Sequence, residues 1–294
     1  MIAEDTVIEK ISIATRLKDY ALLTKLRLAV LVVISAVATF FFAGGNFGIQ
    51  LVYLVAGGFL ITGASNALNQ VMEKDLDLKM NRTKNRPLPA GRMGSLEAIV
   101  IAVLIGIAGL ILLFNINFLS GTLGLLALVM YVFIYTPMKR LTPWAVFTGA
   151  FPGAIPPMLG VVAATNEFGL MAGIMFLVQF AWQFPHFWAI AWVTDEDYAK
   201  AGFSLLPSKG RKDKSSAFQV MLYSLFLVPI SLLPWAFDMT GKTTLIVGTI
   251  LGFWFFMKAY RLYLTLDDKV ARSLMFASFI YLPIIQFLYV FDKL

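Results

Sequence analysis

The chain has 294 residues, of which 59% are hydrophobic and only 14% are charged. Because soluble domains carry about 25% charged residues, this composition excludes an ordinary water-soluble domain. The chain contains no cysteine, which excludes disulfides, thiolate nucleophiles and cysteine-ligated metals. Its net charge of +7 does not indicate a nucleic-acid partner, since membrane proteins gather basic residues on their cytoplasmic side.

The first 27 residues precede every apolar run and contain five basic and four acidic side chains. A signal peptide would contain an apolar core, and a transit peptide would be rich in arginine and poor in acids. We therefore interpret residues 1–27 as an N-terminal tail.

Nine apolar runs of roughly 20 residues follow, and a helix of that length crosses a bilayer core of about 30 Å. Strands of a membrane barrel would be about 10 residues long with alternating polarity, whereas these runs are apolar on all sides. The sequence predicts an all-α polytopic membrane protein with a single transmembrane domain over residues 28–294. The nine predicted spans are 28–47, 50–71, 96–114, 118–137, 143–164, 168–192, 217–237, 243–260 and 273–291.

The charged residues divide unequally between the two sides of the predicted membrane. The tail and the loops after the second, fourth, sixth and eighth spans contain 22 of the 24 basic residues, leaving only Lys242 and Lys293 on the other side. Basic residues mark the cytoplasmic side, so we predict a cytoplasmic N-terminus and an external C-terminus. The same side holds 14 of the 17 acidic residues, which the positive-inside rule does not explain.

The first cytoplasmic loop contains the segment "NALNQVMEKDLDLKMNRTKNRPLPAGR", residues 66–92. Asn69, Glu73 and Asp77 recur every four residues, so a helix continuing to about Met80 would place them on one face. Oxygen ligands of this kind suit Mg²⁺, and the arginines that follow suit phosphate. The alternative is a solvated loop with incidental charge pairs, but an acidic stripe at the end of a membrane helix is costly and favours a diphosphate site.

A second segment, "AWQFPHFWAIAWVTDEDYAKAGFSLLPSKGRKDK", repeats this order of apolar helix, acids and basic loop. Its acids are Asp195, Glu196 and Asp197, and its "LLPSKGR" resembles the earlier "PLPAGR". The repetition predicts two related halves whose loops meet over one cytoplasm-facing cavity in the helix bundle. Two acid clusters there are suited to two Mg²⁺ ions that bridge a diphosphate.

Two further features adjoin this predicted site. The loop "YTPMKRLTPW" adds Tyr135, Lys139, Arg140 and Thr142, in which the two basic residues are either diphosphate ligands or membrane anchors. His186 is the only histidine, so a histidine-based zinc site is excluded. It is left with three possible roles: substrate contact, acid or base, and hydrogen-bonded structural residue.

Asn69, Glu73 and Asp77 resemble the N-x-x-x-D-x-x-x-D motif of the UbiA-type intramembrane prenyltransferases, with Glu73 where Asp is usual. The longer string with Asp75, Asp77, Met80, Arg82, Thr83, Arg86 and Pro87 is similar to one branch, the haem O synthases. The strings "YTPMKR", "GAIPP", "PHF" and "DEDYAKAGFSLLP" also resemble that branch and occur in the same order. The resemblance covers roughly residues 20–290.

This resemblance implies a nine-helix enzyme of the prokaryotic plasma (inner) membrane that uses Mg²⁺. It would transfer a farnesyl group from farnesyl diphosphate to a vinyl group of haem B, which is a substrate and not a prosthetic group. The product would be haem O, and partners would include the lipid bilayer and haem A synthase or a terminal oxidase assembly. The residues and the resemblance together assign catalysis to Asn69, Glu73, Asp77, Arg82 and Arg86; metal binding to Asn69, Glu73, Asp77, Glu196 and Asp197; diphosphate binding to Arg82, Arg86, Lys139 and Arg140; and substrate binding to Asp75, Tyr135, His186 and Tyr198.

Three other functions fit some of these features. A UbiA-type enzyme acting on a quinone precursor or another aromatic ring would share the diphosphate site. A secondary transporter would place its charges near the bilayer midplane in broken helices, whereas most acids here lie at one face. A non-catalytic assembly factor for a haem oxidase would lack transferase activity.

Overall fold

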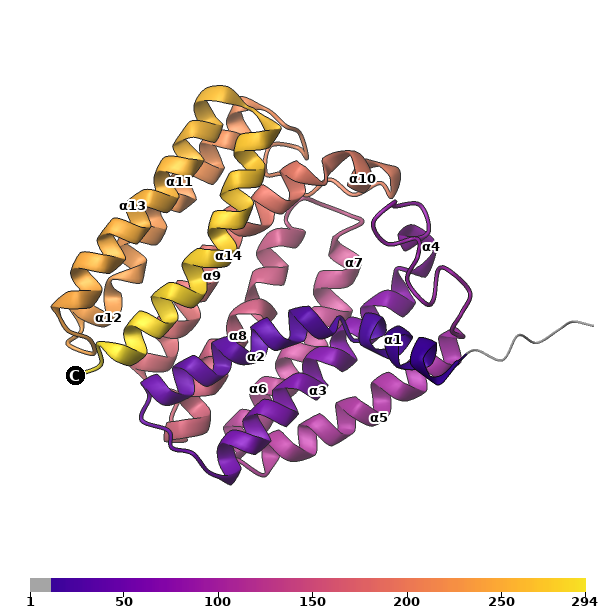
Figure 1. The fold of residues 1–294 in the computed structure, drawn as a ribbon, viewed down its shortest axis with the longest axis horizontal. Coiled ribbons are helices and arrows are strands. Elements are labelled where there is room, and N and C mark those ends of the chain that lie inside the picture. The colour runs from indigo at the N-terminus through magenta and orange to yellow at the C-terminus, as the bar shows by residue number, and fades with distance from the viewer. Residues whose placement is uncertain (1–11) are drawn as a thin grey trace, which may run out of the picture.

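The computed structural model describes residues 12–294, and its regular elements over that range are all helical (Figure 1). This confirms the predicted all-α class. The helices are α1 (Ile13–Leu23), α2 (Leu26–Phe42), α3 (Ile49–Met72), α4 (Lys74–Asp77), α5 (Ser95–Phe114), α6 (Phe118–Val129), the π-helix η1 (Met130–Tyr135), α7 (Thr136–Met138), α8 (Ala145–Thr165), α9 (Leu170–Val193), α10 (Asp195–Lys200), α11 (Lys214–Ser231), α12 (Leu233–Ala236), α13 (Lys242–Thr265) and α14 (Asp268–Phe291).

Eight helical segments within residues 12–294 are long and apolar enough to cross a membrane, and they match the second to ninth predicted spans. The first predicted span, 28–47, differs most from its helix. α2 ends at Phe42 because the chain turns at Gly44, whose φ of +89° favours glycine. α1 and α2 pass the same test only as a pair bent by 51°. The predicted tail 1–27 therefore contains α1 and the start of α2, while residues 1–11 lie outside the described range.

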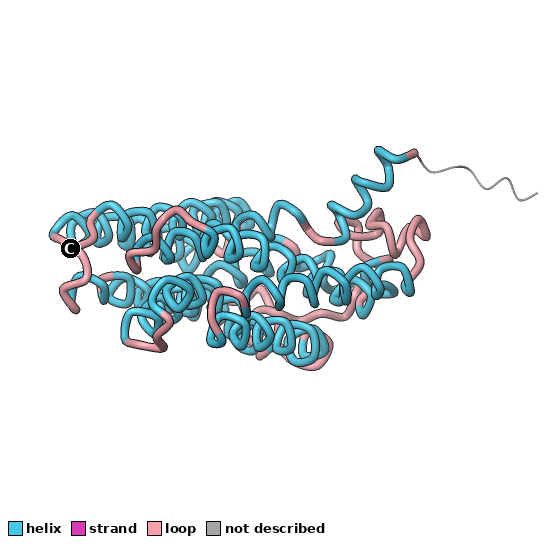
Figure 2. The backbone as a smooth tube through the Cα atoms, turned by 90° about the horizontal axis from the view of Figure 1, so that it is seen from below, coloured by secondary structure: helices cyan, strands magenta, loops and turns pink. Residues whose placement is uncertain are grey.

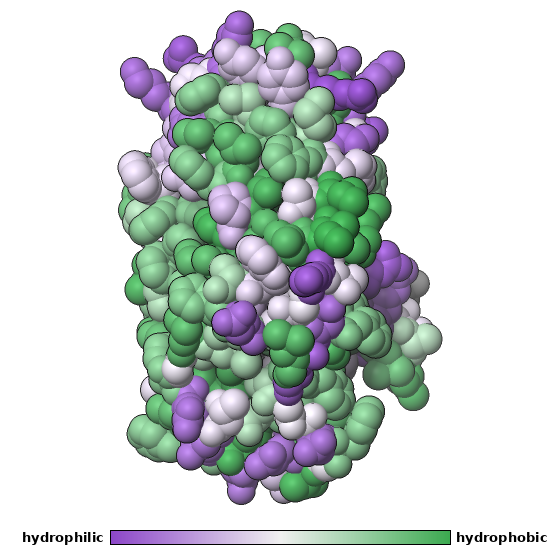
Figure 3. Space-filling view, turned by 90° about the vertical axis from the view of Figure 1, so that its left-hand side faces the viewer, coloured by the Kyte–Doolittle hydropathy of each residue, from purple (hydrophilic) through white to green (hydrophobic). Residues whose placement is uncertain are grey.

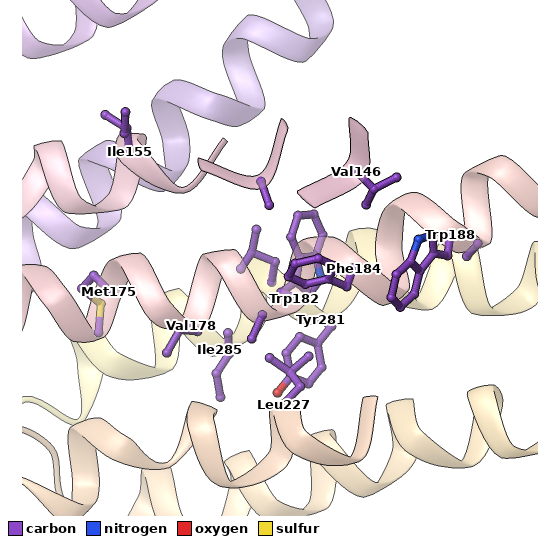
Figure 4. Packing of buried hydrophobic residues seen from close by; sticks show 14 of the residues in the cluster. Val146, Ile155, Met175, Val178, Trp182, Phe184, Trp188, Leu227, Tyr281 and Ile285 are labelled. Carbon is purple, nitrogen blue, oxygen red and sulfur yellow. The ribbon is translucent and has the colours of Figure 1, made fainter. Parts of the chain in front are cut away.

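α8 and α9 form the centre of the bundle. In each of them 72% of the most apolar stretch is buried, against 28% in α5 and α13. Figure 4 shows Trp182, Phe184 and Trp188 of α9 packed among side chains from α8, α11 and α14. The remaining long helices surround this pair. Hydrophobic side chains cover much of the face in Figure 3, with hydrophilic side chains at its top edge and in patches across its middle and bottom. An apolar exterior of this kind suits a bilayer.

The bend between α1 and α2 is fixed by hydrogen bonds to α3. Gln70 Nε2 donates to the carbonyls of Leu22 and Leu23 at 2.9 and 2.7 Å, and Asn66 Nδ2 donates to Thr24 O at 3.2 Å. These bonds supply donors to carbonyls at the C-terminal end of α1, where the regular helical bonds run out. Lys25 occupies the bend with φ of 49°, and the bend turns its side chain toward α3.

α1 itself projects from one edge of the bundle (Figure 2) and is held by a buried ion pair. The guanidinium of Arg92 donates to both carboxylate oxygens of Asp19, at 2.8 to 3.1 Å, and also to Asn85 O at 3.0 Å. Asp19 is 1% exposed, so the paired geometry offsets the cost of burying its charge. α1 is thereby tied to the loop between α4 and α5.

The crossing of α2 and α8 depends on Gly160. A Cβ at this position would lie 2.0 Å from Ala36 O and 2.3 Å from Thr39 Oγ1, so we expect Gly160→Ala to destabilise the fold by about 1–3 kcal/mol. Gly173→Ala on α9 is the matched control, because a Cβ there meets nothing within 4 Å and alanine favours a helix by about 1 kcal/mol. Apparent melting temperatures in one detergent test this, and equal values for the two variants would contradict it.

Candidate functional site

The ends of several helices gather polar side chains at one end of the bundle. Asn69 lies in the last turn of α3, Glu73 follows at its C-terminus, and Asp77 ends α4. The exposed fractions of these three residues are 0, 3 and 1%. The expected continuous helix to Met80 is interrupted at Glu73, yet Asp77 N still donates to Glu73 O at 2.8 Å. The nearly helical spacing is therefore kept, and all three side chains stay buried.

Each of these oxygen-bearing side chains contacts one basic group. Lys25 Nζ donates to Asn69 Oδ1 at 3.1 Å. Lys139 Nζ lies 2.5 Å from Glu73 Oε1, and Arg86 Nη1 donates to Asp77 Oδ2 at 2.6 Å. The basic groups come from the α1–α2 bend, the segment after α7, and the loop after α4. Three separate parts of the chain therefore meet at the end of α3.

With all five groups ionised, the two carboxylates and three basic side chains of the cluster carry one net positive charge. A water-poor site with excess positive charge attracts an anion with several oxygens, such as a diphosphate. The guanidinium of Arg86 and the two ammonium groups provide donors for those oxygens. The site is thus suited to binding phosphate groups at the end of a membrane-embedded bundle.

These residues also fit a divalent cation. Within residues 12–294 no three His, Asp or Glu side chains gather as a metal site by themselves, so Asn69, Glu73 and Asp77 would hold a cation only with water or phosphate oxygens completing its shell. Mg²⁺ is commonly bound in this way, through one or two carboxylates and substrate phosphates. Glu73 Oε1 is buried and, although Lys139 is close, receives no hydrogen bond of good geometry in the described chain. Glu73 Oε1 can therefore coordinate a cation or accept a hydrogen bond from a ligand.

The loop after α4 is built to present Arg86. Thr83, 1% exposed, donates from Oγ1 to Asp77 O at 2.8 Å, and Arg86 N donates to Thr83 O at 2.9 Å. The Arg92 anchor to α1 holds the far end of this loop. Of the other predicted residues in the segment, Asp75 is exposed and is not brought into the cluster.

The π-helix η1 positions one wall of the site. Thr136 Oγ1 donates to Tyr131 O at 2.9 Å and accepts from Asn69 Nδ2 at 3.2 Å, which links α3 to η1. π-helical turns are rare and concentrate at functional sites. The Lys139 ammonium lies 5.0 Å from the centre of the Tyr135 ring, within cation–π distance. Tyr135 and Lys139, both predicted from the sequence, therefore lie at the cluster.

Arg140 has a different partner from the one predicted. Its Nη2 donates to Met72 O at 2.6 Å, which satisfies a carbonyl at the C-terminus of α3. In this structure Arg140 supports the position of Glu73 through the backbone.

The second acid cluster separates into three environments. Asp197 accepts hydrogen bonds from Asn81 N at 2.8 Å and Arg82 N at 3.0 Å, so it joins α10 to the loop after α4. Burial alone would raise the pKa of this carboxyl, but these two backbone donors and Lys200 lower it. Glu196 is exposed. Burial, together with Asp268 and Glu196, raises the pKa of Asp195 against the opposing effect of Lys212.

Aromatic side chains accompany the contact between the two loops. The Arg82 guanidinium lies 6.0 Å from the ring centre of Tyr198, and the Tyr198 ring packs edge-on against Phe203. Phe203 is in turn 5.8 Å from the Lys139 ammonium. Tyr198 thus belongs to the same region as the cluster. His186 does not, because its contacts are with α9 and α14.

Lys25 is the residue of the cluster that the sequence analysis missed. It is one of five basic residues in the predicted tail, and only the bend at residues 24–25 directs it to Asn69. Its place immediately before the first apolar run was the available signal, since a lysine there lies at the depth of the site.

Comparison with known proteins agrees with this geometry. The model of the UbiA prenyltransferase family matches residues 30–282. The chain belongs to this family. Two relatives, from Flavobacterium psychrophilum and Christiangramia forsetii, are 47% and 46% identical over 94% and 95% of this chain, with the same shares of their own lengths, and both are named protoheme IX farnesyltransferase. The predicted resemblance is confirmed.

Solved structures of the UbiA family share the fold. A digeranylgeranylglyceryl phosphate synthase superposes with a TM-score of 0.79 at 19% identity, covering 94% of this chain and 98% of the other. A UbiA homologue from Archaeoglobus fulgidus bound to GPP and Mg²⁺ superposes with a TM-score of 0.64 at 13% identity, covering 92% and 99%. At these identities the likeness establishes the fold of this UbiA family member.

We expect Asp197→Asn to loosen the contact between the two loops. The amide has one acceptor oxygen in place of two, and a hydrogen bond to a charged group contributes about 1.5–3 kcal/mol. Backbone amides of Asn81 and Arg82 should therefore exchange with deuterium at least about tenfold faster.

The exchange should be measured with a metal chelator present, so that any effect on cation binding does not contribute. Glu196→Gln is the control because its side chain is exposed one residue away. Unchanged exchange at Asn81 and Arg82 in Asp197→Asn would show that the carboxylate does not hold this loop.

Proposed function

We propose that this protein transfers a farnesyl group from farnesyl diphosphate to a vinyl group of haem B, adds water and forms haem O. The observation that carries the transferase assignment is the buried cluster of Asn69, Glu73 and Asp77, each in contact with a basic group. The names of the relatives at 44–47% identity support farnesyl as the donor group and protohaem as the acceptor.

In the proposed reaction the C–O bond of farnesyl diphosphate breaks, and the diphosphate leaves with the bonding electrons. Lys25, Lys139 and Arg86 stabilise the negative charge that develops on its oxygens, and they are already in place before the reaction. Bound Mg²⁺, held by Asn69, Glu73 and Asp77, would supply further neutralisation of this charge. Glu73 and Asp77 must then exchange part of their present basic contacts for the cation.

The acceptor is an alkene, whose π electrons form the new C–C bond with the allylic carbon. The resulting cation on the acceptor takes up water, a C–O bond forms, and one proton is released. No strongly basic side chain is needed to activate the nucleophile, which agrees with a site built from charge stabilisation. The aromatic rings of Tyr135, Tyr198 and Phe203 border the site and limit access of other water.

A small apolar cavity lies along one side of α3, and it would have to widen to admit the chain of the prenyl donor. It lies between α2, α3, α5, α6 and α8. Ile61 in its wall is eight residues before Asn69 on α3, or about 12 Å along a helix. Its lining includes Val33, Gly58, Ile61, Leu113, Ala127 and Ile155.

The remaining assignments follow from the same geometry. We assign Asn69, Glu73 and Asp77 to the first cation, and Arg82 joins Arg86 and Lys139 as a diphosphate ligand when the donor binds. A second cation at Glu196 and Asp197 would require Asp197 to release its two backbone donors. Tyr135 and Tyr198 stay as proposed substrate contacts, and Arg140 acts through the end of α3. Asp75 is exposed outside the cluster, so its proposed substrate contact rests on the sequence alone.

We further propose nine spans, in which α2 crosses the membrane as the first span and α1, bent away from it, lies on the cytoplasmic side, with the site facing the cytoplasm of a prokaryotic inner membrane. The basic residues at that end of the bundle support this orientation. Residues 1–27 then form a cytoplasmic N-terminal segment and residues 28–294 one domain. Transfer of the product to haem A synthase or a terminal oxidase assembly follows as a proposed partnership.

We expect Asp77→Asn to reduce haem O formation by at least about a hundredfold, because the amide cannot neutralise a cation and leaves Arg86 without its anion. The purified protein is incubated with farnesyl diphosphate, Mg²⁺ and haem B, and products are read by mass spectrometry. Glu167→Gln, exposed at the opposite end of the bundle, is the control for charge removal. Normal turnover by Asp77→Asn would refute its role, and prenylation of an aromatic acid in place of haem would refute the acceptor.

The absence of cysteine allows the orientation to be tested with single introduced thiols. In intact cells, Phe47→Cys and Glu167→Cys should react with a membrane-impermeant maleimide, whereas Lys18→Cys and Lys209→Cys should react only after permeabilisation. All four residues are exposed. Labelling of Lys18→Cys and Phe47→Cys from the same side would contradict a first span across the membrane.

A further inference from the structure

His186 lies on α9 and is joined to α14 by a hydrogen bond inside the bundle. Its Nδ1 is 2.7 Å from Ser278 Oγ, and the residue is 7% exposed. The imidazole stacks on Trp182 at 4.2 Å between ring centres, and Phe279 meets it edge-on at 5.1 Å. The ring is therefore fixed in position and orientation by both helices.

The hydrogen bonds determine which nitrogen of His186 carries the proton. Met275 O lies 2.6 Å from Ser278 Oγ and can only accept, so with the serine proton directed to this carbonyl Oγ accepts from His186. Nδ1 is therefore protonated and Nε2 has a free lone pair. No group among residues 12–294 forms a hydrogen bond with Nε2.

A lone pair held in this way is the usual arrangement of a metal-binding histidine. Such histidines donate their other N–H to a protein group, which fixes the tautomer and the direction of the free nitrogen. Here Ser278 is that acceptor, and Met275 O fixes the serine. In the described chain no other His, Asp or Glu completes a metal site, so the metal must arrive with its remaining ligands. A metalloporphyrin fulfils this condition, because its ring supplies four nitrogens and leaves axial positions open.

The surroundings of His186 also suit a flat apolar ring. Phe279 is 41% exposed and lies beside His186, while Trp182 is held by a hydrogen bond from Nε1 to Ser278 O at 3.1 Å. α2 and α14 are joined near the external end by Gln286 and Ser35, and they diverge toward the end of the bundle with α4 and α10 (Figure 1). Ser278 is eight residues from Gln286, or about 12 Å along a helix, toward that end. His186 thus lies where the two helices have begun to separate.

We propose that His186 Nε2 is an axial ligand of the iron of the haem B substrate, and that Ser278 is the positioning residue that sets its tautomer. The proposal rests on the proposed function, since it concerns the acceptor of that reaction. Coordination at one point on α9 would fix the porphyrin relative to the diphosphate cluster at the end of α3. The imidazole binds as a neutral ligand and no covalent bond of the porphyrin changes.

The test is titration of the purified full-length protein with haem B, without prenyl donor, followed by Soret absorption and electron paramagnetic resonance. The wild type should show a histidine-ligated spectrum. His186→Ala should lose that spectrum and bind haem B at least about tenfold more weakly, and added imidazole should restore the spectrum. Ser278→Ala keeps the ligand but removes the acceptor of Nδ1, so it should retain haem with an altered ligand spectrum and roughly tenfold lower affinity.

Binding of metal-free protoporphyrin IX distinguishes coordination of the iron from packing against the porphyrin ring. If His186 binds iron, His186→Ala should weaken the binding of haem B much more than the binding of protoporphyrin IX. Equal losses of affinity for the two ligands would overturn the proposal. An unchanged haem spectrum in His186→Ala would also overturn it, even if turnover fell. If either result overturns the role of His186 but the wild type still forms haem O, the proposed function stands. If the wild type neither binds haem B nor forms haem O, the role of His186 and the proposed function are both refuted.

Discussion

The structure depends on the mutual neutralisation of charges buried at one end of the bundle. Glu73 and Asp77 would each be strongly destabilising as isolated carboxylates in water-poor surroundings. Lys139 and Arg86 offset this cost, and Lys25 adds a third basic group through Asn69. Because the basic groups come from three parts of the chain, the cluster constrains the α1–α2 bend, the loop after α4 and the segment after α7. With all five groups ionised, the same arrangement has one excess positive charge, so the contacts that stabilise the fold also prepare it for an anionic ligand.

The supporting contacts show how a membrane protein gives such a site rigidity. Helix ends carry carbonyls without donors, and here side chains near the site supply them: Gln70 for α1 and Arg140 for α3. Asp197 provides the corresponding connection between α10 and the loop after α4 through backbone donors at Asn81 and Arg82. Within the bundle the contacts are mostly apolar, and polar pairs such as His186 with Ser278 are few. This pair leaves the lone pair of His186 Nε2 unused, and we explain that by the binding of a substrate at this nitrogen.

The sequence predicted the residues of the cluster more accurately than their partners. Four-residue spacing was sufficient to associate Asn69, Glu73 and Asp77, although the helix is interrupted at Glu73. Arg86 and Lys139 were placed correctly beside them because they follow soon after predicted membrane spans on the same side. Lys25 was not identified, since a left-handed residue in a bend has no periodic signature. The acids at 195–197 could not be distinguished by sequence. Their different environments depend on Asn81, Arg82 and Lys212, which are distant from them in the chain.

The sequence by itself determined the all-α class, eight of the predicted spans and, except for Lys25, the residues that form the charged cluster, together with the family. These properties depend on composition, run length and local spacing, which are encoded over one or two helical turns. Only the tertiary structure decided which basic group meets which oxygen, the roles of Arg140 and Asp197, and the tautomer of His186. Each of these depends on the approach of segments distant in sequence, as when Ser278 of α14 meets a histidine 92 residues earlier in the chain. Approach of this kind is set by packing of the whole bundle, and no local pattern specifies it.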